Sequence, residues 1–217
     1  MDLVSVLYER IIKNAIKKQE LPEHIVLALA ESDLLADMNF GKLSSFVSWC
    51  NEMGLKTVTV YISILEVDAQ MSKKICGKLS QEIPPWLFEL TRNINVITRG
   101  EKEVRRYGGD GMQVNISIGF GGKYELTRAM KEIMKNVENG SLAPEDIDEE
   151  TIESHLLFKS EPELVIRAGG KRLTDFLIWQ SVYSELYFTD VNWLDFRKVD
   201  FLRVIRDFQK RQRRFGK

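Results

Sequence analysis

Six short apolar runs, rich in Val, Ile and other strand-favouring residues, alternate with helix-like patterns along this chain. They cover residues 24–30, 56–64, 94–100, 112–120, 163–169 and 184–190. Parallel strands need a crossover connection, usually a helix, and a sheet built in this way is covered on both faces. The alternation therefore predicts an α/β fold with a mainly parallel, six-stranded sheet flanked by helices.

The segments between these runs carry apolar residues at helical spacing. The stripes are Leu43, Phe46, Val47, Cys50 and Met53; Leu126, Met130, Ile133, Met134 and Val137; and Phe201, Val204, Ile205 and Phe208. In residues 71–93, Gly77 and the pair Pro84 and Pro85 are expected to interrupt any long helix. The acidic stretch 143–153 indicates a helix start rather than a metal site.

An amphipathic helix is predicted at the N-terminus, within residues 1–20. Its apolar stripe consists of Leu3, Val4, Leu7, Ile11, Ile12, Ala15 and Ile16. Packing of this stripe against the chain's own domain is favoured over peripheral contact with a membrane surface, which stays the alternative.

Length and charge limit the kind of protein. The 217 residues, 44% of them hydrophobic, can bury the core of one domain, and no repeat or long linker marks a second. We therefore expect a single domain over residues 1–217, ending in a basic tail at 209–217. The formal net charge of -1 argues against nucleic-acid binding, which needs a clearly basic face.

The cysteines and histidines are few and dispersed. Cys50 and Cys76 cannot form a disulfide framework and lack zinc spacing, and His24 lies far from His155. No apolar stretch approaches the roughly 20 residues that cross a bilayer, and no secretory leader is visible. These features predict a cytoplasmic protein in a reducing compartment, without a transition-metal site.

A candidate anion site follows the fifth run, in the segment "IRAGGKR" at 166–172. Its members, with the next hydroxyl, are Arg167, Gly169, Gly170, Arg172 and Thr174. Glycines let the backbone approach a ligand, and two guanidinium groups present forked donors to phosphate oxygens. A diphosphate suits this set, while a strand-to-helix turn with solvated cations is an equally weighted alternative on spacing alone.

The wider context resembles a known family. The stretch Glu163 to Asp190, "ELVIRAGGKRLTDFLIWQSVYSELYFTD", is similar to the signature of the cis-prenyltransferases, the undecaprenyl and dehydrodolichyl diphosphate synthases. "FGGKYEL" (120–126), "VNWLDF" (191–196) and "RRFG" (213–216) match the family in the same order. The resemblance extends from about His24 to the end of the chain.

This resemblance implies the cis-prenyltransferase fold and a role in isoprenoid biosynthesis. Family members condense isopentenyl diphosphate with an allylic diphosphate to make polyprenyl diphosphate, on a dimer that uses magnesium. By the resemblance, isopentenyl diphosphate would contact Arg167, Arg172 and Thr174, and Glu185 would place the magnesium. The tail residues that would reach the partner's substrate are Arg214, Phe215 and Gly216.

The chain departs from the family pattern in its N-terminal half. The segment 24–37 puts Ala30 where the family motif "MDGNxRW" has its essential aspartate, and alanine can neither ligate magnesium nor take a proton. Glu31 and Asp33 are weak substitutes because they are displaced along the chain. Of the family's "FSxENW", only Glu66 is retained. Arg167 and Arg172 are also one residue closer than in the family.

Our first hypothesis is therefore a non-catalytic subunit of a heteromeric cis-prenyltransferase. It would pair with a catalytic homologue, as a heterodimer or heterotetramer, and donate its tail to the partner's site. The first alternative is a self-sufficient homodimeric synthase with a non-standard acid. The second is a non-enzymatic module that binds diphosphate or polyprenyl lipid.

Overall fold

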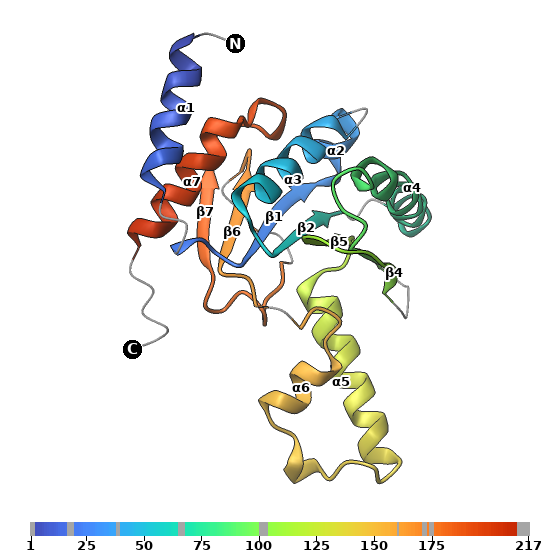
Figure 1. Cartoon of the computed structure of the whole chain (residues 1–217). Coiled ribbons are helices and arrows are strands. Elements are labelled where there is room, and N and C mark those ends of the chain that lie inside the picture. Colours follow the sequence, from blue (N-terminus) through green and yellow to red (C-terminus); the bar gives the residue numbers. More distant parts are fainter. Residues whose placement is uncertain are drawn as a thin grey trace.

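A computed structural model describes residues 3–16, 20–37, 40–64, 68–99, 104–159, 161–170, 173 and 176–211. Its centre is one seven-stranded sheet in the order β4-β3-β5-β2-β1-β6-β7 (Figure 1). The strands are β1 (His24–Ala30), β2 (Thr57–Ser63), β3 (Ile94–Thr98), β4 (Arg105–Tyr107), β5 (Gln113–Ile118), β6 (Leu164–Ala168) and β7 (Glu185–Thr189). The predicted α/β fold with a mainly parallel sheet is confirmed.

The number of strands differs from the prediction of six. The additional strand is β4, which pairs antiparallel with β3 at the edge of the sheet, Ile94 facing Tyr107 and Val96 facing Arg105. Three residues are too few to show the alternation by which a strand is recognised, and two of these three are arginines. All other pairs in the sheet are parallel.

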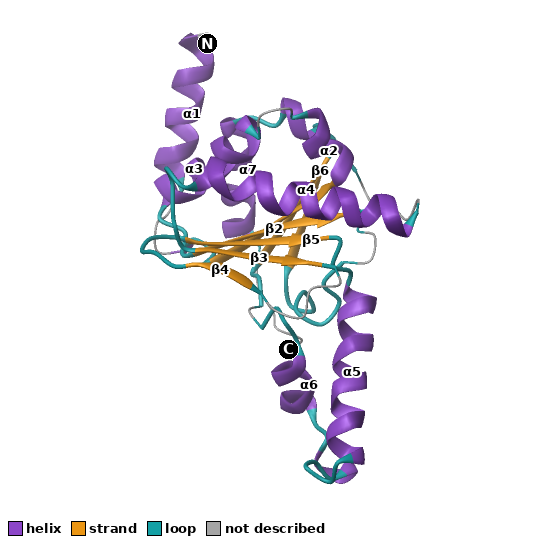
Figure 2. Cartoon of the chain, turned by 90° about the vertical axis from the view of Figure 1, so that its right-hand side faces the viewer, coloured by secondary structure: helices purple, strands orange, loops and turns teal. Residues whose placement is uncertain are grey.

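The helices lie on both sides of the sheet, but unequally. They are α1 (Leu3–Ala15), α2 (Glu31–Ala36), α3 (Gly41–Met53), α4 (Ala69–Leu87), α5 (Gly122–Glu138), α6 (Glu149–His155) and α7 (Lys198–Lys210). Figure 2 shows α1, α2, α3, α4 and α7 on one side, while α5 and α6 lie on the other side and extend away from the sheet. Within the described residues, no helix is both long and apolar enough to cross a membrane.

Helix α4 corrects the expectation that Gly77 and the two prolines break this region. It continues through Pro84 and Pro85 and ends at Leu87. Because Pro84 has no N–H to give to the carbonyl of Ser80, that oxygen accepts a hydrogen bond from Arg105 Nη1 at 3.4 Å instead. An apolar stripe that includes the buried Leu79, Ile83 and Leu87 holds the helix against the core.

The strands divide their side chains between two cores. On β1, Ile25, Leu27 and Leu29 belong to the large core beneath the helical layer, together with Ile12 and Ile16 of the N-terminal segment. The predicted packing of the N-terminal stripe on its own domain is confirmed for those two isoleucines. On the opposite face, a smaller cluster consists of Val26, Ala28, Tyr61, Val165, Phe176 and Leu177.

Polar side chains also lie on this second face, near the amino ends of the strands. His24 Nε2 lies 2.8 Å from the Thr59 hydroxyl, which also accepts a hydrogen bond from the Asn115 amide at 3.3 Å. Burial lowers the pKa of His24 from 6.5 to about 4. The folded chain therefore holds this imidazole neutral at pH values where an unfolded chain protonates it.

This difference predicts a loss of stability in acid. Between pH 6.5 and 4 the unfolded state binds more protons than the folded state, so the free energy of unfolding falls as the pH falls. In the wild type, the free energy of unfolding falls between pH 7 and pH 4.5. We expect this fall to be smaller by roughly 2 kcal/mol in His24→Gln. Urea unfolding at both pH values measures it, with His155→Gln as the matched control that keeps the wild-type decrease. Equal decreases in wild type and His24→Gln would rule out this role of His24.

Candidate functional site

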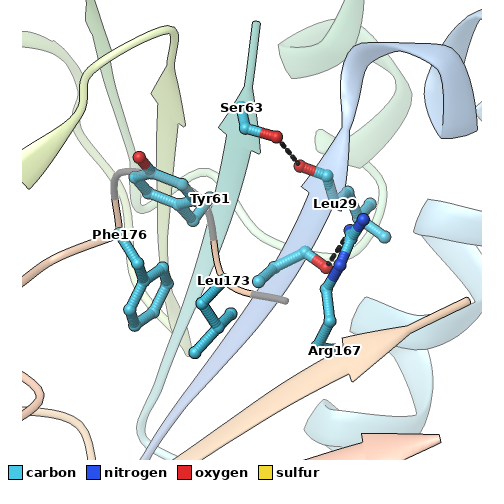
Figure 3. A pocket seen from close by; sticks show the side chains of 7 residues that line it. Leu29, Tyr61, Ser63, Arg167, Leu173 and Phe176 are labelled. Carbon is cyan, nitrogen blue, oxygen red and sulfur yellow. Dashed lines mark hydrogen bonds between the residues drawn. The ribbon is translucent and has the colours of Figure 1, made fainter. Parts of the chain in front are cut away.

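A pocket lies toward the carboxyl ends of three neighbouring strands (Figure 3). It is lined by Ala28, Leu29, Tyr61, Ser63, Arg167, Leu173 and Phe176. Strand β1 pairs with β2 on one side and β6 on the other, so the connections diverge at this point. Open parallel sheets bind ligands beyond the carboxyl ends of their strands at such a switch point.

The strand register forms this pocket. Ala28 pairs with Tyr61 of β2 on one side and with Arg167 of β6 on the other. Paired residues of parallel strands point to the same face of the sheet. The methyl group of Ala28 therefore leaves space between the tyrosine ring and the guanidinium group. The predicted anion-binding Arg167 thus faces an aromatic ring across a small residue.

Within the described residues, the contacts that position Arg167 use one of its terminal nitrogens. Nη1 donates to the carbonyl of Ala28 at 3.0 Å and lies 3.4 Å from Asp33 Oδ2. The side chain is 17% exposed. Among the described residues, neither Nε nor Nη2 of Arg167 donates a hydrogen bond. Those two groups form the edge of the guanidinium that can grip two oxygens of one phosphate.

The glycines after β6 have distinct local roles. Gly169 has φ +70°, a left-handed conformation that favours glycine. A Cβ on Gly170 would lie 3.5 Å from Arg167 Nε, so this backbone passes directly beside the guanidinium. The role of both glycines in anion binding stays a prediction. Arg172 and Thr174 lie outside the described residues, and their assignment stays a prediction.

Glu31 and Asp33, the two acids that follow Ala30, differ in position. Ala30 ends β1, and its N–H donates to Asp33 Oδ2 at 2.8 Å. This same oxygen faces Arg167, so Asp33 reaches the site. Neither acid lines the pocket itself, and Glu31 is buried on α2 without a described contact to Arg167. Of the two candidates, the geometry favours Asp33.

Glu185 lies at the amino end of β7, away from the carboxyl ends of the strands where the pocket lies. It begins β7 and pairs with Leu164, whereas Arg167 is level with Phe188. Three residues of strand correspond to about 10 Å. Glu185 Oε2 instead pairs with Arg211 Nη1 at 2.9 Å. Its role as a magnesium ligand stays a prediction, and no group of three or more His, Cys, Asp or Glu side chains that could hold a metal occurs in the described part of the chain.

The remaining predicted residues fall outside the described structure. These are Glu66 of the eroded second motif and the tail residues Arg214, Phe215 and Gly216. Their assignments stay predictions.

Sequence reasoning missed the residues that β2 and the segment after β6 contribute to the pocket. Ser63 donates to the carbonyl of Leu29 at 3.2 Å, and the rings of Tyr61 and Phe176 meet edge to face with centroids 5.0 Å apart. Tyr61 and Ser63 end the second apolar run, and Phe176 follows the glycine-rich segment. Their meeting depends on the order of the strands, which the sequence of runs does not contain. The fold and the pocket thus define an α/β protein whose candidate site combines a cationic side chain with apolar side chains.

Comparison with known proteins identifies the family. Residues 63–216 match the family described as "Putative undecaprenyl diphosphate synthase". A tritrans,polycis-undecaprenyl-diphosphate synthase (geranylgeranyl-diphosphate specific) of Methanocaldococcus jannaschii is 34% identical over 248 aligned residues, covering 97% of this chain and 88% of that protein. A short-chain Z-isoprenyl diphosphate synthase of Mycobacterium bovis is 32% identical, and the alignment covers 94% of this chain and 91% of that protein. The chain therefore belongs to the cis-prenyltransferase family of undecaprenyl diphosphate synthases.

Solved structures share the fold. Lavandulyl diphosphate synthase from Lavandula x intermedia superimposes with a TM-score of 0.74 at 24% identity, covering 92% of this chain and 100% of that chain. A probable undecaprenyl diphosphate synthase from Campylobacter jejuni superimposes with a TM-score of 0.68 at 22% identity, covering 90% of this chain and 99% of that chain. The family resemblance stated from the motifs is confirmed, whereas the finer resemblance to non-catalytic subunits has no support in these relatives.

The position of Arg167 generates a binding prediction. Arg167→Lys keeps the positive charge but loses the fork that can hold two oxygens. We expect its affinity for inorganic pyrophosphate to fall roughly 10-fold or more, as measured by calorimetry. Arg106→Lys, on the exposed edge strand β4, is the matched control and should bind like the wild type. Unchanged binding by Arg167→Lys would remove Arg167 from the anion site.

Proposed function

We propose that this chain acts in cis-prenyl transfer as a polyprenyl diphosphate synthase that condenses isopentenyl diphosphate with an allylic diphosphate. The observation that carries this proposal is the pocket in which Arg167 faces the apolar side chains of Tyr61, Leu173 and Phe176. Isopentenyl diphosphate has matching chemistry, because an anionic head is joined to a short branched hydrocarbon. In the transfer, a carbon–carbon bond forms as the allylic carbon–oxygen bond breaks, releasing diphosphate and one proton.

The relatives favour a chain that catalyses this reaction by itself. Those described above are named as synthases, and the alignments cover most of each protein. They support the alternative of a self-sufficient enzyme better than our first hypothesis of a subunit that is inactive alone. The self-sufficient synthase is therefore the main proposal.

Asp33 is the acid that we propose for this enzyme. Its Oδ2 lies 3.4 Å from Arg167 Nη1, so it would stand beside a diphosphate held by that arginine. Magnesium, which the family resemblance implies, commonly takes one or two carboxylates and fills its other positions with phosphate oxygens and water. A carboxylate beside a diphosphate fits such an ion, whose charge when bound would offset the negative charge of the isopentenyl diphosphate that Arg167 is proposed to hold. Ala30 offers no ligand atom in its side chain.

A second copy of the chain is the proposed partner. Exposed apolar side chains occur on α5 and on the segment 178–183, which approaches the start of α5 at Gly122. Met130 and Met134, one helical turn apart, are 57% and 62% exposed. The sequence pattern assigned both methionines to an ordinary helix stripe, and the structure leaves them facing outward. Exposed apolar side chains on a helix that extends away from the sheet support association between subunits.

The supporting subunit of a heteromeric enzyme is the second candidate function. The observation that favours it is the end of β1, where the side chain of Ala30 is a methyl group. In addition, Asp33 Oδ2 already accepts a hydrogen bond from the Ala30 N–H. In this case a homologue with an intact "MDGNxRW" would supply catalysis. The non-enzymatic binding module predicts ligand binding without activity in either arrangement.

Replacing Asp33 tests the main proposal. We expect Asp33→Asn to lower kcat at least roughly 100-fold while keeping the fold, because it removes the charge beside Arg167. Incorporation of labelled isopentenyl diphosphate by the purified chain with magnesium measures kcat. Asp37→Asn is the matched control: Asp37 Oδ2 accepts from Lys42 N at 2.9 Å at the start of α3, so the change weakens a comparable helix-start contact outside the pocket. Its kcat should stay within about twofold of wild type.

The same assay separates the candidates. Turnover by the pure wild-type chain that Asp33→Asn abolishes supports the main proposal. An inactive chain that stimulates a homologue with an intact motif supports the second candidate. Binding without activity or stimulation supports the module. Wild-type turnover by Asp33→Asn would contradict the assignment of Asp33.

The exposed methionines predict the state of association. We expect the wild-type chain to sediment as a dimer, and Met134→Glu to shift it to the monomer mass because a charge cannot be buried in an apolar interface without a partner. Analytical ultracentrifugation at micromolar concentration measures both masses. Met71→Glu, at an exposed methionine of α4, is the matched control and should remain dimeric. A dimeric Met134→Glu variant would show that this surface of α5 is not the contact.

A further inference from the structure

Two sequence blocks that the anion site does not account for meet in the structure. Glu125 comes from "FGGKYEL", and Gln180 ends the "FLIWQ" that follows the glycine-rich segment. Glu125 Oε2 accepts a hydrogen bond from Gln180 Nε2 at 2.9 Å. Only 1% of Glu125 is exposed. A buried carboxylate needs such partners, because burial without them is costly.

The other oxygen of Glu125 holds a third segment. Oε1 accepts from the backbone N–H groups of Leu157 at 3.0 Å and Phe158 at 3.1 Å. Gln180 Nε2 also donates to the carbonyl of Phe158 at 2.8 Å. The helix α5, residues 157–158 and the segment 176–180 are therefore joined through one carboxylate, which we call the Glu125 clamp. Burial raises the pKa of Glu125, while the donors from Phe158, Gln180 and Leu157 oppose that rise.

A close backbone contact lies next to the clamp. A Cβ on Gly122 would lie 2.1 Å from the carbonyl oxygen of Phe176 and 2.9 Å from the N–H nitrogen of Ile178. Only glycine permits α5 and this segment to approach so closely. Glu125 is one turn further along α5, so the glycine sets the spacing and the carboxylate fixes it.

The segment held by the clamp forms one wall of the pocket. Phe176 lines the pocket and contacts the Tyr61 ring, which stands across Ala28 from Arg167. Glu125 itself is not a lining residue. Loss of the clamp would leave buried donors without their acceptor and let Phe176 move, which changes the space available beside Arg167. Small displacements of this kind weaken ligand binding without removing any ligand contact.

We propose that Glu125 is a positioning residue that, through Gln180 and Phe176, sets the affinity of the Arg167 pocket for a diphosphate. This inference rests on the proposed diphosphate function of the pocket. It assigns the acid and amide of two separate motifs to one task, the placement of a pocket wall.

The test compares substitutions of the same kind on one helix. Glu125→Gln keeps the shape but turns one oxygen into a donor that faces the donor of Gln180. Glu132→Gln is the matched control, since Glu132 pairs only with Arg128 among the interactions described for it and is far more exposed. Isothermal calorimetry with inorganic pyrophosphate and with isopentenyl diphosphate measures affinity in the full chain, and circular dichroism verifies the fold.

We expect Glu125→Gln to weaken binding of both probes at least roughly 10-fold, and Glu132→Gln to stay within about twofold of wild type. If the chain is active, the KM for isopentenyl diphosphate should rise while kcat changes less than about threefold. A second variant, Gln180→Met, removes the hydrogen bonds that Gln180 donates to Glu125 and to the Phe158 carbonyl. It should weaken binding in the same direction if Glu125→Gln does not fold.

The outcomes distinguish the inference from the function beneath it. Wild-type affinity in a folded Glu125→Gln or Gln180→Met variant, even with a lower melting temperature, would overturn the positioning role and leave the proposed function intact. Failure of the wild-type chain to bind either probe would overturn the proposed function, and this inference with it.

Discussion

The pairing of β1 with β2 on one side and β6 on the other determines how the walls of the pocket face one another. It sets Ala28 between Tyr61 and Arg167 and directs all three to the same face. Because side chains alternate along a strand, a shift of one residue in either ladder would turn an aromatic or a cationic wall to the opposite face. The alternate residues of β1, which are Ile25, Leu27 and Leu29, oppose that shift because it would remove them from the main core.

The electrostatics of the pocket follow from this arrangement. Arg167 is held by a carbonyl from β1 and faces Asp33 from the helix that β1 leads into, so the cation and its acid come from adjacent elements. An anion that binds Arg167 therefore meets a carboxylate at the same place. A divalent ion would resolve that repulsion, which is consistent with magnesium-dependent diphosphate chemistry in the proposed function.

Much of the fold could be predicted because its strands are buried runs with clear limits. The run at 24–30 matches β1 in full, and the run at 184–190 exceeds β7 by one residue at each end. The sequence predicts that Pro84 and Pro85 interrupt helix α4, but the helix continues through them. The Ser80 carbonyl, which loses its helical donor at Pro84, accepts from Arg105 of β4, and this contact is not visible in the local sequence. Arg167 and its glycines were visible as a local cluster. Tyr61 and Glu125 were not, because their roles arise only when separate segments meet.

The short strand β4 has a consequence for the behaviour of the molecule in concentrated solution. An exposed sheet edge offers unpaired backbone groups to other chains and invites aggregation. Here the edge is only three residues long and carries Arg105 and Arg106. Arg105 is also turned toward α4 by its contact with the Ser80 carbonyl. A neighbouring chain would find few backbone groups to pair with and a local positive charge to overcome, so this border discourages growth of the sheet from one molecule into the next.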